Sequence, residues 1–433
     1  MDKIKVGVLG AYRGSSMINY CKVAGNAEVV AICDKAPDAL FEQKKRCEGL
    51  GITFYDNFDD FINHDMDAVV LANYANEHAP FAIRAMKKGK HVFSEVLPVQ
   101  TMKEAVELVE TVEETGKIYA YGENYCYMPA TFEMKKLYEK GELGEFEYGE
   151  GEYVHNCEPI WHAITYGDKN HWRNNMYSTY YCTHSLGPII HITGLRPVSV
   201  TGFEGKKVTR ERKNGNKSGA FGIEMVTLEN DGIVKSIHGG LYARSYWYTL
   251  YGSKGIMESG RMAAEDGDVH RLYINRDAFP SGYGTGKRED YRPSQPLDDI
   301  AKSFGHAGSD FYCMYHFIEK IKGNPEADII DVFEALDMSL PGLFAYFSVL
   351  DGGVPKDIPN LRDKAQRDIW RNNTACTDPK VAGDMLLPCF SKGQPEIEDE
   401  IYEIVKQKWD DECKKETGSY RDMAFGQGEM KDN

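Results

Sequence analysis

The chain has 433 residues, 42% of them hydrophobic, and this length and apolar content predict a large core divided between two domains. Its formal net charge of −16 argues against nucleic acid or an anionic membrane as a partner, because either would require a basic face. The first ten residues run directly into a short apolar strand and fit neither a signal peptide nor a membrane span, so we expect a soluble, cytoplasmic protein that acts on small molecules. The 10 cysteines are scattered without a Cys-x-x-Cys pair, which predicts reduced thiols.

The first 120 or so residues alternate short apolar stretches with helical patterns. Continuous apolar stretches of this kind are typical of buried parallel strands. Thr101 and Glu104 have the spacing of a capping box at a helix start, and Gly116 ends that helix. We therefore predict a doubly wound, parallel α/β domain over residues 1–122. Its expected strands are 4–10, 28–34, 67–73, 90–95 and 117–123.

The pattern changes near residue 146 to long strands in which polar and apolar residues alternate. Asn230, Asp231 and Gly232 form a strong turn signal between two of these strands. Such alternation predicts a large, open, mostly antiparallel sheet in an α+β substrate domain over residues 123–370. An exposed sheet face predicts self-association into a homo-oligomer. Residues 371–433 read as a charged C-terminal helical extension on a solvated surface or at a subunit contact.

A glycine turn follows the first strand and is the first candidate ligand site. Gly10 permits a tight turn, Gly14 permits close approach of the backbone to a pyrophosphate, and Tyr12 and Arg13 lie between them. The full Gly-x-Gly-x-x-Gly motif is absent, because Tyr12 takes the place of its middle glycine. Asp34 ends the next strand, where a carboxylate accepts hydrogen bonds from a ribose and repels a 2′-phosphate. The sequence therefore predicts a dinucleotide site that takes NAD rather than NADP.

Three segments carry a family resemblance: "ANYANEH" (72–78), "GKHVFSEVLP" (89–98) and "YYCTHSLGPIIHITGLRP" (180–197). With them the chain resembles the Gfo/Idh/MocA oxidoreductases, which join an N-terminal Rossmann domain to an open antiparallel sheet domain. The resemblance implies further cofactor contacts from Asn73, His78 and Glu95, although Glu95 could instead tie its loop to backbone amides. Members of this family commonly place a proton-transferring lysine where this chain has Val96. Valine cannot move a proton, so the usual dehydrogenase machinery is altered here.

Further segments narrow the resemblance. "GENYCY" (122–127), "GEGEYVH" (149–155), "CTHSLGP" (182–188) and "GHAGSDF" (305–311) are similar to segments of the NAD-dependent glycoside hydrolases typified by α-N-acetylgalactosaminidases. Glycoside dehydrogenases that form 3-keto sugars share much of this pattern. The resemblance implies that Glu123, Tyr153, Tyr181 and His184 carry substrate and chemistry.

Those residue types suit the oxidation of a sugar hydroxyl. His184, with a reference pKa of about 6.5, is suited to accept the hydroxyl proton. A ketone at the third ring carbon makes the proton on the second carbon acidic, and a phenolate at Tyr153 could remove it to expel the anomeric group. Tyr153 starts from a pKa of about 10, so we expect His184 or Arg173 to lower it. Water would then add, and the returning hydride would leave no net oxidation.

Each of these residues also has a structural interpretation. His184 could belong to the core or cap a helix, Tyr153 could pack within its strand, and Glu123 could be a surface carboxylate. Residues 161–177 are dense in aromatic and polar side chains and could form either a substrate loop or an interface loop. As a substrate loop it would offer a sugar Trp161, Trp172 and Arg173, together with Asn124.

Histidines near this loop raise the question of a metal. His155, His162 and His171 lie close in sequence to Glu152, but no recognisable ligand spacing supports a metal site, and we predict none.

Three functions follow from the sequence. The chain cleaves a glycoside in a redox-neutral cycle, releases a 3-keto sugar without cleavage, or binds NAD as a catalytically silent sensor.

Overall fold

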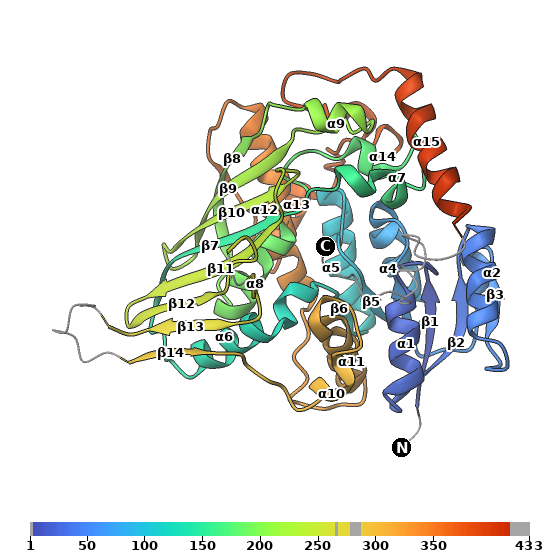
Figure 1. Cartoon of the computed structure of the whole chain (residues 1–433), viewed down its shortest axis with the longest axis horizontal. Coiled ribbons are helices and arrows are strands. Elements are labelled where there is room, and N and C mark those ends of the chain that lie inside the picture. Colours follow the sequence, from blue (N-terminus) through green and yellow to red (C-terminus); the bar gives the residue numbers. More distant parts are fainter. Residues whose placement is uncertain (1–2, 265–266, 278–286, 416–433) are drawn as a thin grey trace.

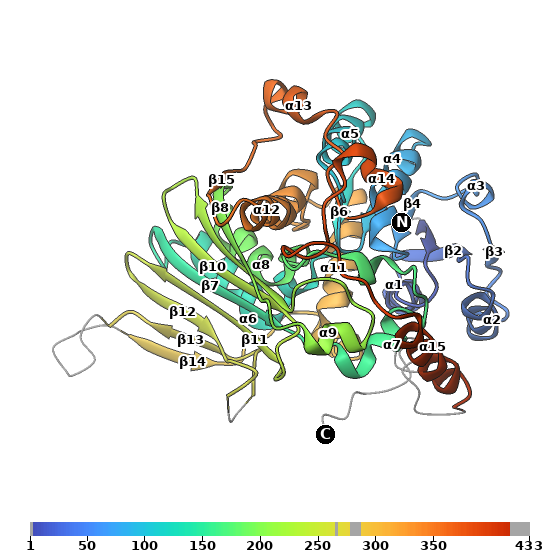
Figure 2. The same ribbon diagram turned by 90° about the horizontal axis from the view of Figure 1, so that it is seen from above.

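A computed structural model of the chain describes residues 3–264, 267–277 and 287–415. Two sheets face each other across a layer of helices, with the larger sheet on the left of Figure 1 and the parallel sheet on the right. Seen from above, helices α8, α11 and α12 lie on the side of the large sheet that faces the first domain (Figure 2). The core is therefore continuous between the two domains, which places their facing edges close together.

The first domain is a parallel sheet of six strands in the order β3-β2-β1-β4-β5-β6. Its central strands are buried on both faces, which explains their uninterrupted apolar sequence. Strand order reverses between β1 and β4, the position at which doubly wound sheets bind ligands beyond the carboxyl ends of their strands. The strands are β1 Ile4–Leu9, β2 Ala27–Cys33, β3 Thr53–Tyr55, β4 Ala68–Leu71, β5 His91–Ser94 and β6 Tyr119–Tyr121.

Helices cover both faces of this sheet. The capping box that begins α5 is formed in full, since Thr101 accepts from the Glu104 amide and Glu104 accepts from the Thr101 amide. Gly116 ends the helix in the left-handed conformation, as predicted. The helices are α1 Ser15–Val23, α2 Pro37–Arg46, α3 Phe58–Phe61, η1 Ala75–Glu77, α4 His78–Lys87 and α5 Met102–Thr115.

The second domain holds a sheet of nine strands in the order β14-β13-β12-β11-β7-β10-β9-β8-β15. The predicted turn at residues 230–232 joins β9 to β10. Strands β7 and β10 run parallel and the other pairs are antiparallel, so the prediction of a mostly antiparallel sheet is confirmed. The strands are β7 Phe146–Val154, β8 Pro197–Glu204, β9 Phe221–Leu228, β10 Ile233–Gly239, β11 Ser245–Gly252, β12 Gly255–Ser259, β13 Leu272–Asn275, β14 Arg288–Tyr291 and β15 Lys356–Asp357.

Helix α8 packs directly on β7, and a glycine makes this possible. A Cβ on Gly151 would lie 1.7 Å from the carbonyl oxygen of Ser185, so only glycine permits this approach. Helix α12 is long and apolar enough to cross a membrane by composition, yet 67% of that stretch is buried inside the protein, where it forms part of the core. The helices of this domain are η2 Asn124–Tyr127, α6 Pro129–Glu139, η3 Glu158–Ile160, α7 Trp161–Ile164, η4 Trp172–Asn175, α8 Thr183–Thr193, α9 Thr209–Lys213, α10 Asp298–Ala301, η5 His306–Gly308, α11 Ser309–Ile321 and α12 Val332–Leu350.

The chain then returns to the first domain. Arg367 pairs with Glu113 at 2.6 Å, which ties α13 to α5, and α15 packs against α7 (Figures 1 and 2). The extension thus contacts the body of the protein and is not only the solvated surface or subunit contact expected from its charges. Residues 416–433 of the predicted extension lie outside the described residues. The helices that follow α12 are α13 Lys364–Trp370, which precedes the predicted extension, and within the extension α14 Pro379–Ala382, η6 Gly383–Met385 and α15 Asp399–Cys413.

Candidate active site

The glycine turn after β1 is closely packed. Gly10 has a φ of 99°, and a Cβ there would lie 2.4 Å from the Ala72 carbonyl. A Cβ on Gly14 would lie 2.2 Å from the Gly10 carbonyl oxygen. Asp34 accepts hydrogen bonds from the Ala11 amide at 2.6 Å and from the Ala36 amide. The turn and the carboxylate are therefore held together at the carboxyl end of β1 and β2.

Two of the predicted cofactor contacts, Arg13 and Glu95, pair with each other. Arg13 Nε donates to Glu95 at 2.9 Å, and its two terminal nitrogens donate to Asp310 at 2.8 and 3.0 Å. Burial raises the pKa of Asp310, but the Arg13 guanidinium opposes this rise and holds that pKa well below its usual range. Glu95 thus binds a guanidinium rather than backbone amides. The network joins the two domains, and Asp310 is a member that the sequence analysis did not single out, although it lies in the "GHAGSDF" segment.

The other predicted cofactor contacts also have partners within the protein. The Tyr12 hydroxyl donates to Asp38 at 2.6 Å. His78 is buried between the Leu97 carbonyl at 2.8 Å and the Asn73 carbonyl at 3.3 Å. Burial lowers the pKa of His78 to about 4, so it is neutral at physiological pH and braces the loops after β4 and β5.

Glu123 and His184 form the centre of the candidate site. Glu123 is fully buried at the end of β6, and its Oε1 accepts from Nδ1 of His184 at 2.7 Å. Its Oε2 accepts from the Thr183 hydroxyl at 2.8 Å, and the Tyr125 amide donates to Oε1 at 3.2 Å. Glu123 is therefore not a surface carboxylate. Because Glu123 occupies Nδ1, Nε2 is the nitrogen left for a substrate.

A row of tyrosine rings lies beside this pair. Tyr153 stacks on Tyr246 with ring centroids 5.2 Å apart and on Tyr181 at 6.4 Å. The His184 ring is 4.6 Å from Tyr153 and 5.2 Å from Tyr181. The structure therefore brings together all four residues predicted to be catalytic. Tyr246 is an addition, placed by the antiparallel pairing of β11 with β7, in which it lies opposite Tyr153.

The phenols of Tyr153 and Tyr181, whose rings both contact His184, differ in their electrostatic surroundings. Burial raises the pKa of Tyr153 well above its usual range, and the opposing charge of Arg173 does not offset this. The expectation that a nearby cation makes Tyr153 a phenolate at neutral pH is therefore wrong for the free site. Burial also raises the pKa of Tyr181, but Arg173 both hydrogen-bonds that phenol and lowers its pKa by charge. Of these two phenols, Tyr181 is the one that a guanidinium stabilises more directly.

The predicted substrate residues fall into two groups. Arg173 lies over the Trp172 ring at 4.5 Å and over the Tyr181 ring at 5.6 Å. Arg173 and Trp172 therefore belong to the site. The Asn124 amide donates to Asp310 at 2.8 Å, which places it at the joint between the domains. Trp161 is buried, and its indole nitrogen donates to Asn174 at 2.9 Å, so its polar edge is used within its own loop.

The same loop reaches across to the glycine turn. Tyr166, in the left-handed region with a φ of 53°, stacks on Tyr12 at 5.4 Å and on Tyr74 at 6.2 Å. Trp409 of α15 meets the Tyr166 ring edge-on at 5.6 Å. We call Tyr12, Tyr74, Tyr166 and Trp409 the aromatic clamp. It links the C-terminal extension to the edge of the sheet where β1 and β4 end.

The histidines considered for a metal are used in other ways. His155 stacks on Tyr153 at 5.8 Å, with its Nδ1 2.8 Å from the Cys157 sulfur. His171 packs edge-on against Tyr74 at 4.6 Å, and His162 lies on α7. Across residues 3–264, 267–277 and 287–415, no group of three or more histidine, cysteine or acidic side chains could hold a metal ion. His155 is thus a neighbour of the tyrosine row, which its sequence position alone did not reveal.

Comparison with known families identifies the first domain. Residues 4–123 match the family model described as "Oxidoreductase family, NAD-binding Rossmann fold", GFO_IDH_MocA. The N-terminal domain is thus similar to the Gfo/Idh/MocA oxidoreductases. The chain is therefore an NAD-dependent enzyme, and the NAD cofactor predicted from Asp34 is confirmed at the level of this family.

Relatives of the chain extend over both domains. It is 26% identical over 396 residues to a "Glycosyl hydrolase family 109 protein" of Solibacter usitatus, which covers 83% of this chain and 88% of the relative. It is 25% identical to a protein of the same name from Streptomyces coelicolor, with 88% of each chain covered. These matches confirm the resemblance to the glycosidase branch stated from the sequence.

Solved structures share the fold of the whole molecule. The aldose-aldose oxidoreductase of Caulobacter crescentus superposes with a TM-score of 0.64 at 17% identity, covering 82% of this chain and 100% of that chain. The WlbA dehydrogenase of Bordetella pertussis, solved with NADH and UDP-GlcNAcA, gives a TM-score of 0.62 at 21% identity, with 82% and 98% covered.

The residues at the end of β1, β2 and β4 fit NAD. A Cβ on Gly10 or Gly14 would clash with neighbouring backbone, so the two glycines set the tight course of the turn, which leads into the N-terminus of α1, where a helix can bind a pyrophosphate. Asp34 keeps lone pairs for a ribose beyond the two amide hydrogen bonds it accepts. The side-chain oxygen of Asn73 is buried without a hydrogen-bond partner among the described residues, which suits a polar ligand at the end of β4.

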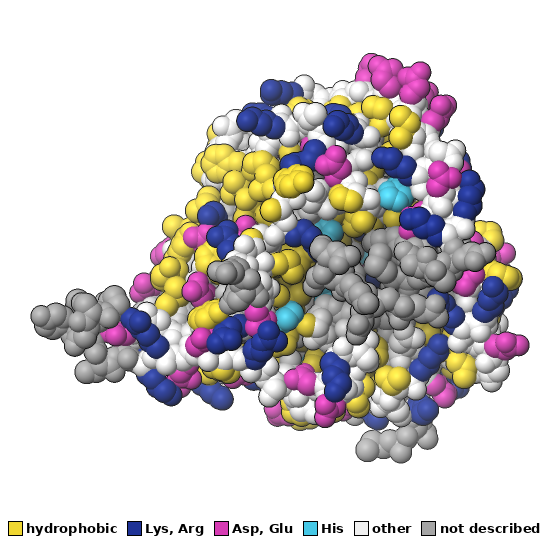
Figure 3. Space-filling model, viewed as in Figure 1, with side chains coloured by type: hydrophobic (Ala, Val, Ile, Leu, Met, Phe, Trp, Pro, Cys, Tyr) yellow, Lys and Arg dark blue, Asp and Glu magenta, His cyan; other side chains and the backbone are white. Residues whose placement is uncertain are grey.

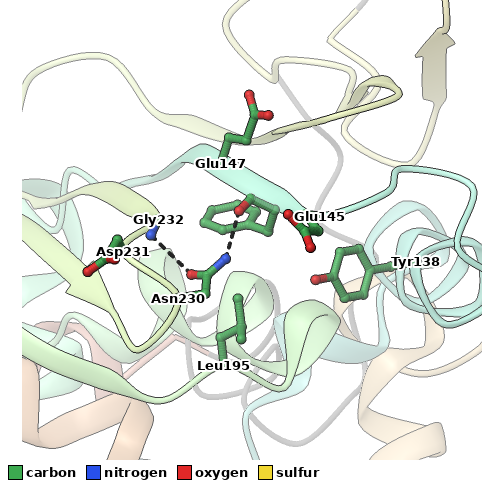
Figure 4. Close-up of a pocket in the computed structure, with 8 residues that line it drawn as sticks. Tyr138, Glu145, Glu147, Leu195, Asn230, Asp231 and Gly232 are labelled. Atoms are coloured by element: carbon green, nitrogen blue, oxygen red, sulfur yellow. Dashed lines mark hydrogen bonds between the residues drawn. The ribbon is translucent and has the colours of Figure 1, made fainter.

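A separate hollow of about 570 Å³ lies far from this site (Figure 4). It opens beside Phe146, at the start of β7, whereas Tyr153 sits seven residues along the same strand, roughly 23 Å away. Asn230 in its wall already donates to the Phe146 carbonyl and accepts from the Gly232 amide. On the face shown in Figure 3, basic and acidic side chains are interspersed. Neither feature competes with the Glu123–His184 centre as the site of chemistry.

Proposed function

We propose that this enzyme oxidises a ring hydroxyl of a glycoside, at the third carbon, and cleaves the glycosidic bond in a cycle without net oxidation. The observation that carries the proposal is the buried Glu123–His184 pair beside the tyrosine row. Val96, which replaces a proton-transferring amine, and the glycosyl hydrolase names of the relatives add support. The substrate is then a small carbohydrate.

The cofactor would be held by the turn at Gly10 and Gly14, with its ribose at Asp34. When bound there, NAD supplies the acceptor for the hydride of the oxidised carbon and later returns it. The protein must therefore provide proton transfer, orientation and a site from which water is largely excluded.

His184 is the proposed acceptor of the hydroxyl proton. Glu123 holds Nδ1, so the free Nε2 faces the incoming hydroxyl and gains the proton when the alcohol is oxidised. The buried carboxylate of Glu123 then stabilises the imidazolium that forms. When the ketone is reduced at the end of the cycle, the same nitrogen returns the proton to the oxygen.

The cleavage step is assigned to the two tyrosines that flank His184. Tyr181 takes the proton from the second carbon as a phenolate, which the charge and hydrogen bond of Arg173 stabilise against the rise in pKa that burial causes. The electron pair of that carbon–hydrogen bond forms a double bond to the anomeric carbon, and the glycosidic carbon–oxygen bond breaks. Tyr153, neutral because of its raised pKa, donates its proton to the departing oxygen. Water then adds at the anomeric carbon, its proton restores Tyr153, and Tyr181 returns its proton to the second carbon.

The test uses the protein as purified and loaded with NAD, then freed of excess cofactor. Nitrophenyl glycosides are added without further NAD, and released nitrophenol and NADH absorbance are followed together. Many equivalents of nitrophenol per protein, with no lasting NADH, support the proposal. NADH without nitrophenol would instead indicate a dehydrogenase that releases a 3-keto sugar. If no sugar reacts at all, the protein would be an NAD-binding sensor.

A second measurement reports the proton transfer itself. In heavy water, a sugar that passes through the ketone and the elimination carries deuterium at its second carbon, which mass spectrometry detects. Cleavage without this label would contradict the elimination route while leaving hydrolysis intact.

A further inference from the structure

Two guanidinium groups flank the tyrosine row. Arg173 lies over Tyr181 at one end, and at the other end Arg244 Nη2 donates to the Tyr246 hydroxyl at 2.8 Å. Tyr153, between the two rings, is therefore one ring away from each positive charge. Arg244 is exposed on the loop that joins β10 to β11, and the Asn156 side chain anchors this loop by donating to the Tyr242 carbonyl at 3.1 Å.

The carboxylates around the site are already engaged. Glu123 binds His184, Glu95 and Asp310 share Arg13, and Glu152 pairs with Arg261 at 2.7 Å. Among residues 3–264, 267–277 and 287–415, Arg244 forms no ion pair with a carboxylate. In a chain with a net charge of −16, Arg173 and Arg244 thus place two positive charges at the ends of the tyrosine row.

We infer that the substrate is an anionic glycoside and that Arg244 binds its anionic group. This inference rests on the proposed function and adds the substrate class. The hydrogen bond to Tyr246 uses Nη2, which leaves Nε and Nη1 for a ligand, and a guanidinium is suited to binding the oxygens of a carboxylate or sulfate. The anionic group would lie about one ring's width from the carbons beside Tyr153 and His184. A hexuronide, with its carboxylate at the sixth carbon, is the sugar that best combines these features.

Matched substrates test this directly. The NAD-loaded enzyme is assayed with a nitrophenyl hexuronide, the corresponding neutral hexoside and the 6-sulfated hexoside, each as both anomers. We expect kcat/KM for an anionic sugar to exceed that for the neutral one by at least about tenfold, the size expected for a hydrogen bond to a charged group. A preference for the uronide over the sulfated sugar identifies a carboxylate, and the reverse order identifies a sulfate. Added salt should reduce the anionic rate more than the neutral rate.

Variants separate binding from folding. Arg244→Gln should reduce the ratio of anionic to neutral kcat/KM by about tenfold or more, and Arg244→Lys should recover part of it. Arg288→Gln, which changes an exposed arginine of β14 at the far edge of the same sheet, should leave the ratio unchanged. An equal loss on both substrates in Arg244→Gln, or a preference for the neutral sugar in the parent enzyme, would overturn the inference.

Binding provides a readout that does not depend on turnover. Calorimetry with NAD-loaded protein and a methyl hexuronide should show binding that Arg244→Gln weakens and Arg288→Gln does not. If no sugar is turned over but this difference is found, the proposed function fails and the anionic site stands. If neutral glycosides are cleaved and the uronide binds no better than the neutral sugar, the inference fails and the proposed function stands.

Discussion

Nδ1 of His184 donates to the carboxylate of Glu123 across 2.7 Å, although the two residues come from the first turn of α8 and the end of β6. The pair links a helix that lies on the large sheet to the edge of the cofactor domain. The orientation of the imidazole is thus set by the domain that binds NAD, while the ring itself faces the tyrosines of the substrate domain. This relationship makes Glu123 a positioning residue whose charge and geometry can be tested separately.

Glu123→Gln should retain the size of the side chain but remove the charge that stabilises an imidazolium. We expect kcat to fall by about 100-fold or more, which is the usual contribution of general acid–base catalysis. NAD binding, measured by titration of intrinsic fluorescence, should not change. The profile of kcat against pH should also shift. A purely structural loss would not cause this shift, since it would lower the rate equally at every pH. A variant with parental kcat would contradict the assignment.

Tyr181→Phe and Tyr153→Phe should impair different steps. Without the Tyr181 hydroxyl, deuterium incorporation at the second carbon in heavy water should be lost together with cleavage. Without the Tyr153 hydroxyl, deuterium should still be incorporated, while cleavage of a methyl glycoside falls by about 100-fold. Cleavage of a nitrophenyl glycoside should fall much less, because nitrophenolate needs no proton to leave. The opposite pattern would exchange the two roles.

The aromatic clamp should slow the exchange of the cofactor. Trp409→Ala removes the edge-on contact with Tyr166, and such contacts contribute about 0.5–1.5 kcal/mol beyond buried area. We expect NADH to dissociate faster by about three- to tenfold, as measured by stopped-flow displacement with excess NAD. Ile404→Ala, at an exposed position of the same helix, is the matched control. Equal dissociation rates in the two variants would show that α15 has no part in cofactor retention.

A buried ion network at the far end of α8 predicts a loss of stability in alkali. His191 Nδ1 donates to Glu334 at 2.6 Å, and its Nε2 lies 3.3 Å from Asp328. Burial lowers the pKa of His191, but these carboxylates together have the larger effect and raise it to about 9. The stabilisation is therefore complete below about pH 6.5, the value in the unfolded chain, and is lost as pH rises through about 9.

The size of this effect follows from the difference in pKa. Urea unfolding should show a decrease in the free energy of unfolding on the order of 3 kcal/mol between pH 6.5 and pH 9.5. His191→Gln should flatten the decrease over this interval. His64→Gln, which changes a histidine bound to the Tyr55 hydroxyl in the first domain, should preserve the slope. A slope in His191→Gln equal to that of the parent would refute the role of His191.

Features that depend on local sequence were predictable. The apolar strands, the turn at Gly10 and the capping box at Thr101 each depend on neighbours within a few residues. The four catalytic candidates were reached through a resemblance, since nothing in the spacing of Glu123 and Tyr153 places them near His184. Contacts set by the pairing of distant strands were not predictable in this way. Tyr246 lies opposite Tyr153 only because β11 pairs with β7 in a particular register.

Burial was the other quantity that the sequence did not supply. The charge of Arg173 could be read directly, but the stronger desolvation of Tyr153 depends on the rings that surround it in the fold. Likewise, the charged composition of α15 indicated a solvated helix, whereas its contacts with Tyr166 depend on the course of the intervening chain. In both cases the interaction that decides the outcome comes from residues distant in sequence.

The contact between Gly151 and Ser185 has a consequence for how deeply the catalytic helix is seated. Ser185 follows His184, and its carbonyl oxygen lies where a methyl group on residue 151 would have to be. Even the smallest side chain there would push the helix outward and move the imidazole with it. The position of the His184 imidazole is thus set by the lack of a side chain at Gly151, on the strand beneath it. Gly151 itself needs no contact with the sugar.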